Sequence, residues 1–127
     1  SNIMLKQKKF YLIDSQDAVI GNSAYDLASL IDDVRLKTSN SLKEEMFNHF
    51  TKKYLNRDLK KFENDFLILS VLRNFKILGI FSRLAKRDNK NIYLKYIPYT
   101  WSLIKLRTKN GKVFDELRSI LNNNKFI

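Results

Sequence analysis

The chain has 127 residues, of which 44% are hydrophobic, and this composition supports one globular domain rather than a disordered segment. It contains no cysteine, which excludes disulfides and thiolate chemistry and fits a cytoplasmic protein. The formal net charge of +11 permits an anionic partner, but the basic residues are spread along the chain rather than clustered.

Two short apolar runs begin the chain, at 3–5 and 10–13, and the polar KQKK between them suits a hairpin turn. We expect the second run to be a buried core strand that ends at Asp14. After a loop, the apolar side chains between 24 and about 35 recur at helical spacing. Asn22 or Ser23 can cap the start of this helix. Its expected apolar face comprises Leu27, Leu30, Ile31 and Val34.

The remainder of the chain predicts helices. Ser41 and Glu44 have the spacing of a capping box, which predicts the start of a helix with an apolar face between 46 and 54. Segment 62–86 is apolar on most sides and predicts a long central helix, ended by 87–91. Basic residues interrupt its most apolar part, so we expect no membrane span.

Segment 93–109 is expected to be a helix that Pro98 either starts or kinks. After Gly111, segment 113–121 predicts a short amphipathic helix, and Gly79 is expected to allow close packing of the long helix. The predicted fold class is mainly α with a short N-terminal β-hairpin, in a single domain over 1–127.

Three carboxylates follow the second strand: Asp14, Asp17 and Asp26. A carboxylate at a strand end can hold Mg²⁺, because a hard cation prefers carboxylate oxygens and water. Phosphoryl transfer needs such an ion to neutralise the nucleotide phosphates. Asn2 begins the hairpin that Asp14 ends, so two oxygen ligands can converge on one metal. For Asp14 considered by itself, the alternative is that it merely caps the turn into the loop.

Three segments resemble the aminoglycoside phosphotransferase superfamily, whose fold is protein-kinase-like. SNIML resembles the tail of its catalytic loop, and LIDSQDAVIGNSAYDLASLIDD resembles its metal-binding segment and the helix that follows. LRNFKILGIFSRLAKRDNKNIYLKYIPYTW, residues 72–101, is similar to a later helix pair. That pair is typical of one branch, the anomeric kinases of N-acetylmuramate and N-acetylglucosamine.

The resemblance implies roles for individual residues. Asn2 and Asp14 would hold Mg²⁺ on ATP, and Asp26 would be a buried helix-start carboxylate that braces the catalytic loop. A carboxylate in a first helical turn also meets the positive end of the helix dipole. Asp17 would cap the loop or approach the sugar. Ser15 stands where the family usually has a core phenylalanine, so either another side chain fills that space or the site is loosened.

The resemblance covers the C-terminal part of the kinase large lobe. It divides the chain into a metal-binding hairpin, loop and bracing helix over 1–40 and a helical, substrate-side subdomain over 41–127. The glycine-rich phosphate loop, the strand lysine and the catalytic aspartate lie upstream in the family. We therefore expect the N-terminal nucleotide-binding lobe as a missing partner, and no kinase activity from this chain by itself.

Arg73, Lys76, Arg83 and Arg87 form a basic stripe along the long predicted helix. Arg73 and Asn74 match the family's R-N-x-K and are candidate donors to sugar hydroxyls, whereas Arg83 and Arg87 are expected to be solvated. The alternative for the stripe is ion pairing with Asp32, Asp33 or Asp65.

A competing function class is a non-catalytic basic helical module that binds nucleic acid or a protein partner. Tyr93, Tyr96, Tyr99 and Trp101 alternate with lysines, a pattern compatible with stacking on bases. Because these residues fall within the family match, packing onto the long helix is the favoured interpretation and nucleic acid is not the expected partner. His49, the single histidine, is expected at the surface rather than in a zinc site.

Overall fold

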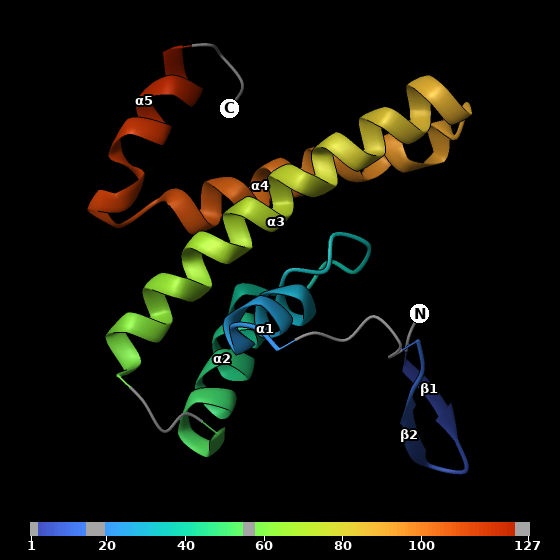
Figure 1. The fold of residues 1–127 in the computed structure, drawn as a ribbon, viewed down its shortest axis with the longest axis vertical. Coiled ribbons are helices and arrows are strands. Elements are labelled where there is room, and N and C mark those ends of the chain that lie inside the picture. The colour runs from blue at the N-terminus through green and yellow to red at the C-terminus, as the bar shows by residue number, and fades with distance from the viewer. Residues whose placement is uncertain (1–2, 15–19, 55–57, 124–127) are drawn as a thin grey trace.

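The structure is a computed structural model that describes residues 3–14, 20–54 and 58–123. It confirms a mainly helical chain with a short N-terminal hairpin (Figure 1). The elements in chain order are strands β1 (Ile3–Lys6) and β2 (Lys9–Leu12), helices α1 (Ser23–Ile31), α2 (Asn40–Tyr54) and α3 (Leu59–Asp88), 3₁₀ helix η1 (Asn91–Tyr96), helix α4 (Ile97–Thr108), 3₁₀ helix η2 (Lys112–Phe114) and helix α5 (Asp115–Asn123).

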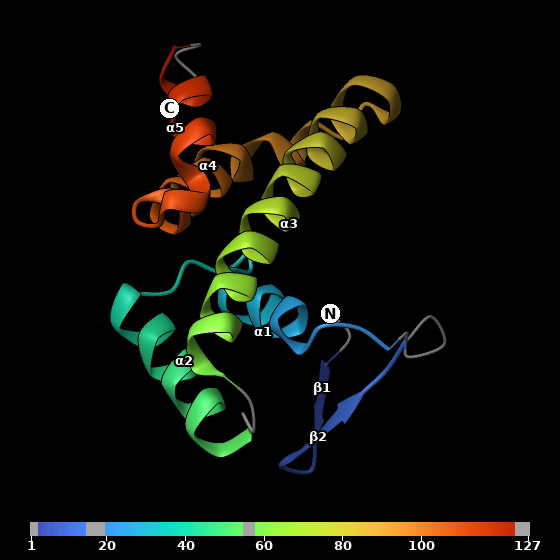
Figure 2. The same cartoon turned by 60° about the vertical axis from the view of Figure 1, so that its left-hand side comes forward.

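The hairpin joins β1 and β2 in antiparallel register through a two-residue turn. Gln7 and Lys8 in this turn have φ values of 50° and 62°, the pair of positive angles that matches the twist of the strands. The expectation of a buried strand at 10–13 is wrong, because Phe10 is 76% and Leu12 79% exposed. The two strands pair with each other and lie apart from the helices in both views (Figures 1 and 2).

Helix α1 begins as expected and ends earlier. The Asn22 side chain accepts a hydrogen bond from the backbone N–H of Ala24 at 3.0 Å, which makes Asn22 the N-cap. The helix stops at Ile31, and Leu30 is 56% exposed rather than part of the apolar face. The residues that α1 buries are Ala24, Leu27, Ala28 and Ile31.

Helix α2 starts at Asn40, so the expected capping box at Ser41 and Glu44 is wrong. Ser39 takes the capping role instead, because its hydroxyl accepts from the backbone N–H of Leu42 at 3.2 Å. The predicted apolar face is half-buried against α1 and α3 over Met46, Phe47 and Phe50, which pack on a core cluster that includes Phe62 and Phe66.

The long helix α3 is confirmed, and it begins three residues before the expected start. Asp58 caps it by accepting from the backbone N–H of Lys60 at 2.8 Å and of Lys61 at 3.2 Å. Asn89 ends it in the left-handed conformation, with a φ of 54°. The expectation that Gly79 allows close packing is wrong, because a Cβ placed there would meet nothing within 4 Å.

Helix α4 returns along α3 (Figures 1 and 2), and Pro98 lies in its first turn, so this proline starts the helix rather than kinking it. Tyr93 and Tyr96 of η1 pack onto the long helix α3, as the favoured interpretation of the sequence predicts. The Phe81 ring lies 5.4 Å from that of Tyr93 and 5.7 Å from that of Tyr96, between centroids. Within the described ranges, no helix is both long and apolar enough to traverse a bilayer.

Candidate functional site

Asp14, the predicted metal ligand, follows the hairpin at an exposed position with a φ of 64°. Aspartate tolerates this left-handed conformation better than most residues. Asn2, Asp17 and Ser15 lie outside the described residues, so their roles stay predictions. Across 3–14, 20–54 and 58–123, no group of three or more histidine, cysteine, aspartate or glutamate side chains is arranged to hold a metal ion. The described part of the predicted magnesium site is therefore the Asp14 carboxylate.

Asp26 lies in the first turn of α1, where the helix dipole favours a carboxylate. The expectation that it is buried is wrong, because its side chain is exposed. The reason is the helical period: α1 turns Ala24, Leu27 and Ala28 toward α3, and Asp26 stands on a different face. A bracing role for Asp26 therefore needs a further segment to lie over the start of α1.

Arg73 and Asn74, the predicted sugar ligands, lie in the middle of α3 near the end of α1. Arg73 is half-buried, and its Nη1 donates to the backbone carbonyl of Asp32 at 3.1 Å. Burial lowers the pKa of the Arg73 guanidinium. Asn74 is fully buried, and its Nδ2 lies 3.4 Å from Ser70 Oγ. Asn74 would therefore need access to solvent before it could contact a sugar.

The densest polar cluster surrounds Asp32, which caps the C-terminal end of α1 and is 0% exposed. Arg107 of α4 binds its carboxylate with two hydrogen bonds, from Nε at 2.8 Å and Nη2 at 2.9 Å. Lys43 Nζ of α2 donates to Oδ1 at 3.1 Å, and Ser70 Oγ of α3 donates to Oδ2 at 2.6 Å. One carboxylate thus ties α1 to the three helices around it.

The charge balance of this cluster is uneven. Burial would raise the pKa of Asp32, but the hydrogen bond and charge of Arg107, with Ser70 and Lys43, outweigh it and hold the pKa below its usual range. Asp32 is therefore ionised at neutral pH. Two cations share this one carboxylate, so the cluster itself carries a surplus positive charge.

The remaining basic residues of the stripe are exposed, as expected for a solvated face. Arg83 and Arg87 are exposed, and Arg87 pairs with its neighbour Asp88 at 2.6 Å. Lys76 Nζ lies 3.4 Å from Tyr25 Oη of α1. Arg87 therefore pairs within α3, whereas Lys76 contacts α1.

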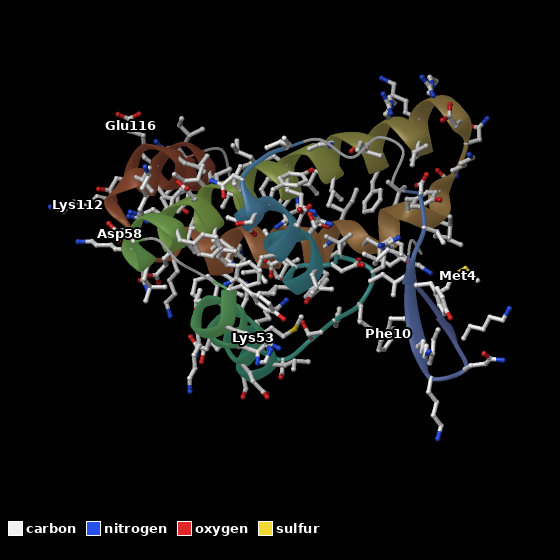
Figure 3. All side chains as sticks on the ribbon, turned by 60° about the horizontal axis from the view of Figure 1, so that its bottom comes forward. Met4, Phe10, Lys53, Asp58, Lys112 and Glu116 are labelled. Atoms are coloured by element: carbon white, nitrogen blue, oxygen red, sulfur yellow. The ribbon has the colours of Figure 1, made fainter. Side chains whose placement is uncertain are left out.

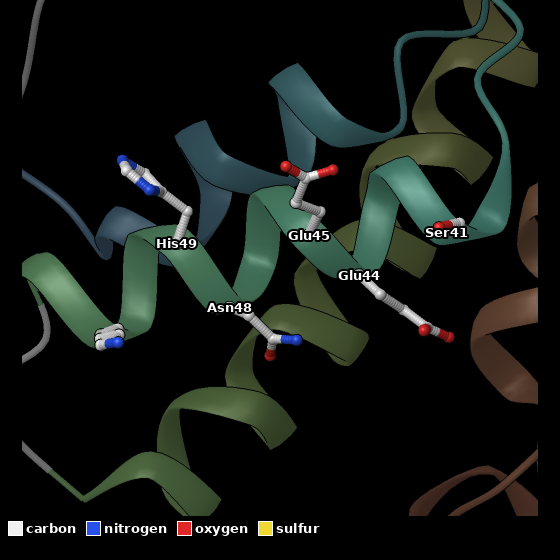
Figure 4. A pocket seen from close by; sticks show the side chains of 6 residues that line it. Ser41, Glu44, Glu45, Asn48 and His49 are labelled. Carbon is white, nitrogen blue, oxygen red and sulfur yellow. The ribbon is translucent and has the colours of Figure 1, made fainter.

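His49 is exposed on α2, as predicted. Figure 4 shows that His49 and Glu45 point to one side of α2, whereas Glu44 and Asn48 point to the other. Two such ligands one helical turn apart are fewer than the three or four protein ligands of a zinc site. This shallow surface therefore carries no metal chemistry that we can assign.

Sequence reasoning identified Asp32 only as one of several possible ion-pair partners of the stripe. Lys43 and Arg107 drew no attention, because each sits among polar neighbours in the chain and no local pattern marks it as buried. The available signal was the position of Asp32 in the sequence, because it directly follows the apolar residues of α1 and comes two residues before Val34, which is also buried. Its partners lie 11, 38 and 75 residues away, a separation that local patterns do not reveal.

The chain is similar to curated proteins named N-acetylmuramate/N-acetylglucosamine kinase. It is 33% identical over 90 residues to the one from Caulobacter vibrioides, which covers 71% of this chain and 25% of that protein. It is 28% identical over 126 residues to that from Pseudomonas aeruginosa, covering 94% and 37% respectively. With the Neisseria meningitidis protein it shares 31% identity over 103 residues, covering 76% and 31%. No protein-family model matches the chain.

The matches span most of this chain but only about a quarter to just over a third of the length of these relatives. They support the sugar-kinase branch that the sequence resembles. They are also consistent with a chain that corresponds to part of a larger kinase.

Proposed function

We propose that this chain is the C-terminal part of a sugar kinase that transfers the γ-phosphate of ATP to an amino sugar. The acceptor we propose is the anomeric hydroxyl of N-acetylmuramate or N-acetylglucosamine. The observation that carries the proposal is the match to kinases of that name over 71% to 94% of the chain. A cytoplasmic location follows from the need for ATP.

Asp14 and Asn2 are the residues that would hold Mg²⁺ in the intact kinase. The exposed position of Asp14, two residues after the end of β2, supports this role, because a hard cation takes carboxylate oxygens. The ion, when bound, supplies charge neutralisation on the transferred phosphate. Asp26 would brace the catalytic loop from the first turn of α1, and Arg73, Asn74 and Asp17 would face the sugar.

The nucleotide-binding lobe is the partner that we propose for the hairpin. Leu5, Phe10 and Leu12 are 66%, 76% and 79% exposed, respectively. A group of large exposed apolar side chains commonly marks a surface that another domain covers. The catalytic aspartate, which would accept the proton of the sugar hydroxyl, belongs to the segment preceding this chain in the proposed kinase.

A chimera tests the proposal. The part of the Caulobacter vibrioides kinase that precedes the matched segment is joined to this chain, and ATP-dependent phosphorylation of both sugars is measured. We expect turnover in the chimera and none above background in the chain by itself. Asp14→Ala should lower kcat/KM at least about a hundredfold, since a metal clamp supplies several kcal/mol of charge stabilisation.

Glu116→Ala is the matched control, because Glu116 is an exposed carboxylate on α5, far from the hairpin (Figure 3). It should leave turnover unchanged. Two results would contradict the proposal: a folded chimera that binds ATP but phosphorylates neither sugar, or an Asp14→Ala chimera as active as its parent. Salt-sensitive binding of RNA by the chain, without any metal requirement, would instead favour a basic helical module.

A further inference from the structure

A cavity of about 530 Å³ lies between α2, α3 and α4. It opens on the side of α2 toward which Glu44 and Asn48 point, opposite to Glu45 and His49 (Figure 4). Its volume is in the range of small-molecule sites in proteins. None of the described residues assigned above to the kinase site, Asp14, Asp26, Arg73 or Asn74, lines it, so it is a separate feature of the helical body.

Two cations reach the wall of this cavity: Lys43, which is buried, and Arg107, which is half-buried. Their side chains are 3% and 14% exposed, and both already bind the single carboxylate of Asp32. Lys43 Nζ also donates to the backbone carbonyl of Ile31 at 2.7 Å, which is neutral and leaves the surplus positive charge in place. The two glutamates that line the cavity, Glu44 and Glu63, are exposed, so an anion beside Lys43 and Arg107 would balance this charge more directly. Because the cations are largely removed from water, their attraction for an anion is screened much less than that of a surface lysine.

Arg107 retains hydrogen-bonding capacity for such an anion. Its Nε and Nη2 face Asp32, which leaves the Nη1 group on the other edge of the planar guanidinium. Among the described residues, the hydrogen bonds of the Arg107 guanidinium are those from Nε and Nη2 to Asp32. The guanidinium carbon also lies over the Phe66 ring, 4.9 Å from the ring centroid, so this contact and the two hydrogen bonds to Asp32 restrain the group before any ligand arrives.

The rest of the cavity suits an organic body rather than a bare ion. Aromatic and aliphatic side chains from three helices line it: Phe47, Leu59, Phe66, Leu67 and Leu106. The exposed rim carries Asn48, Asn110, Glu44 and Glu63, which can accept hydrogen bonds from hydroxyl or amino groups at the outer end of a ligand. The glutamates disfavour a second negative charge at that end.

We propose that this cavity binds a small organic ligand with a single anionic group, a carboxylate or a phosphate, which lies against Arg107 and Lys43, and with an apolar body that rests on the Phe47 and Phe66 side. The anionic group of such a ligand lies at its inner end and the apolar part in its middle. Any hydroxyl or amino groups at its outer end would donate hydrogen bonds to the rim. The site is independent of the proposed kinase activity and is a property of the 127-residue chain.

Calorimetric titration of the full chain tests this, with phenylacetate as the carboxylate probe and phenyl phosphate as the phosphate probe. Phenylacetamide is the matched neutral probe, with nearly the same shape as phenylacetate. We expect one or both anions to bind at least about tenfold more tightly than phenylacetamide, the ratio typical of one charge-assisted hydrogen bond. Which anion binds more tightly identifies the class of ligand.

Replacing Arg107 would also disturb Asp32, so the decisive variant is Asn48→Trp, which fills the rim and leaves the ion pairs intact. It should weaken anion binding at least about tenfold, with an unchanged circular dichroism spectrum. Lys53→Trp is the control, since Lys53 is exposed on α2 and does not line the cavity. Equal binding of phenylacetate and phenylacetamide, no binding of either anion, or an Asn48→Trp variant that binds like the parent would each overturn the proposal.

Discussion

The hairpin and the helical body hold their carboxylates in opposite ways. Asp14 is exposed at the end of β2, whereas Asp32 is fully buried and receives hydrogen bonds from side chains of α2, α3 and α4. An exposed carboxylate can bind a ligand from solvent. The buried carboxylate of Asp32 already receives hydrogen bonds from two cations and a hydroxyl, so it stabilises the fold. Burial, rather than residue type, therefore distinguishes the carboxylate proposed to bind a metal from the one that stabilises the fold.

The apolar side chains show the same contrast. In the body, Phe62 and Phe66 are buried between α1 and α2, and they join the core cluster of the fold. In the hairpin, Phe10 and Leu12 remain exposed. The helical body therefore has a hydrophobic core of its own. The proposed metal ligand Asp14 instead follows the hairpin, which the described helices do not cover.

Replacing Asp32 tests how much the buried carboxylate contributes to stability, the largest effect that this comparison predicts. Asp32→Asn keeps the size of the side chain but leaves Lys43 and Arg107 buried without a counter-charge. We expect the free energy of unfolding to fall by about 3–5 kcal/mol, as when one member of a buried ion pair is removed. Urea unfolding followed by the fluorescence of Trp101, the single tryptophan, measures this.

Asp33→Asn is the matched control for that variant. Asp33 is the next residue, and it pairs with Arg35, whose side chain is 61% exposed. A solvent-exposed pair contributes about 0–1 kcal/mol, so this change should cost no more than that. If both variants lose the same free energy of unfolding, the Asp32 cluster stabilises the fold no more than an exposed ion pair does.

A pair of phenylalanine substitutions sharpens the apolar half of the comparison. Phe62→Ala removes a fully buried ring and should lower the free energy of unfolding by about 3–5 kcal/mol. Phe10→Ala removes a ring that is 76% exposed and should change it by no more than about 0.5 kcal/mol. The same urea assay compares them, and a large loss for Phe10→Ala would mean that the hairpin packs against the body.

Much of the fold follows from local patterns in the sequence. Helical spacing predicts α1, α3 and α4, and Asn22, Pro98 and Asn89 act at the ends where such residues are favoured. The cap of α2 was misassigned because Ser39 and Ser41 both fit that role, and only the backbone geometry decides between them. Local rules thus define the elements well and their ends less well.

The burial of particular residues was harder to predict, because it depends on contacts between distant segments. The continuous apolar run at 10–13 indicates a strand, but whether anything covers that strand depends on another part of the protein. Asp32, Lys43 and Arg107 come from three separate elements and carry no shared sequence signal. The predicted metal ligands rest on family resemblance, whereas this cluster required the structure.

The smallest loss expected from a change in the core concerns one hydrogen bond to Asp32. Ser70→Ala removes the hydroxyl that donates to Oδ2 at 2.6 Å and leaves both cations in place. Hydrogen bonds to charged groups contribute about 1.5–3 kcal/mol, and we expect a loss of this size at neutral pH. Ser102→Ala is the control, because Ser102 is exposed and its hydroxyl donates to the backbone carbonyl of Tyr99.

The cost of Ser70→Ala should also depend on pH. The folded pKa of Asp32 is held below its usual range, so the stabilisation is complete above the ordinary aspartate pKa of about 3.9 and is lost as pH falls through the folded value. Without the serine hydroxyl, that folded pKa rises. The difference in unfolding free energy between parent and variant should therefore be constant from pH 7 to about 5 and shrink below about pH 3.9. A difference that stays constant into strong acid would mean that Ser70 stabilises the core through packing rather than through the ionised carboxylate.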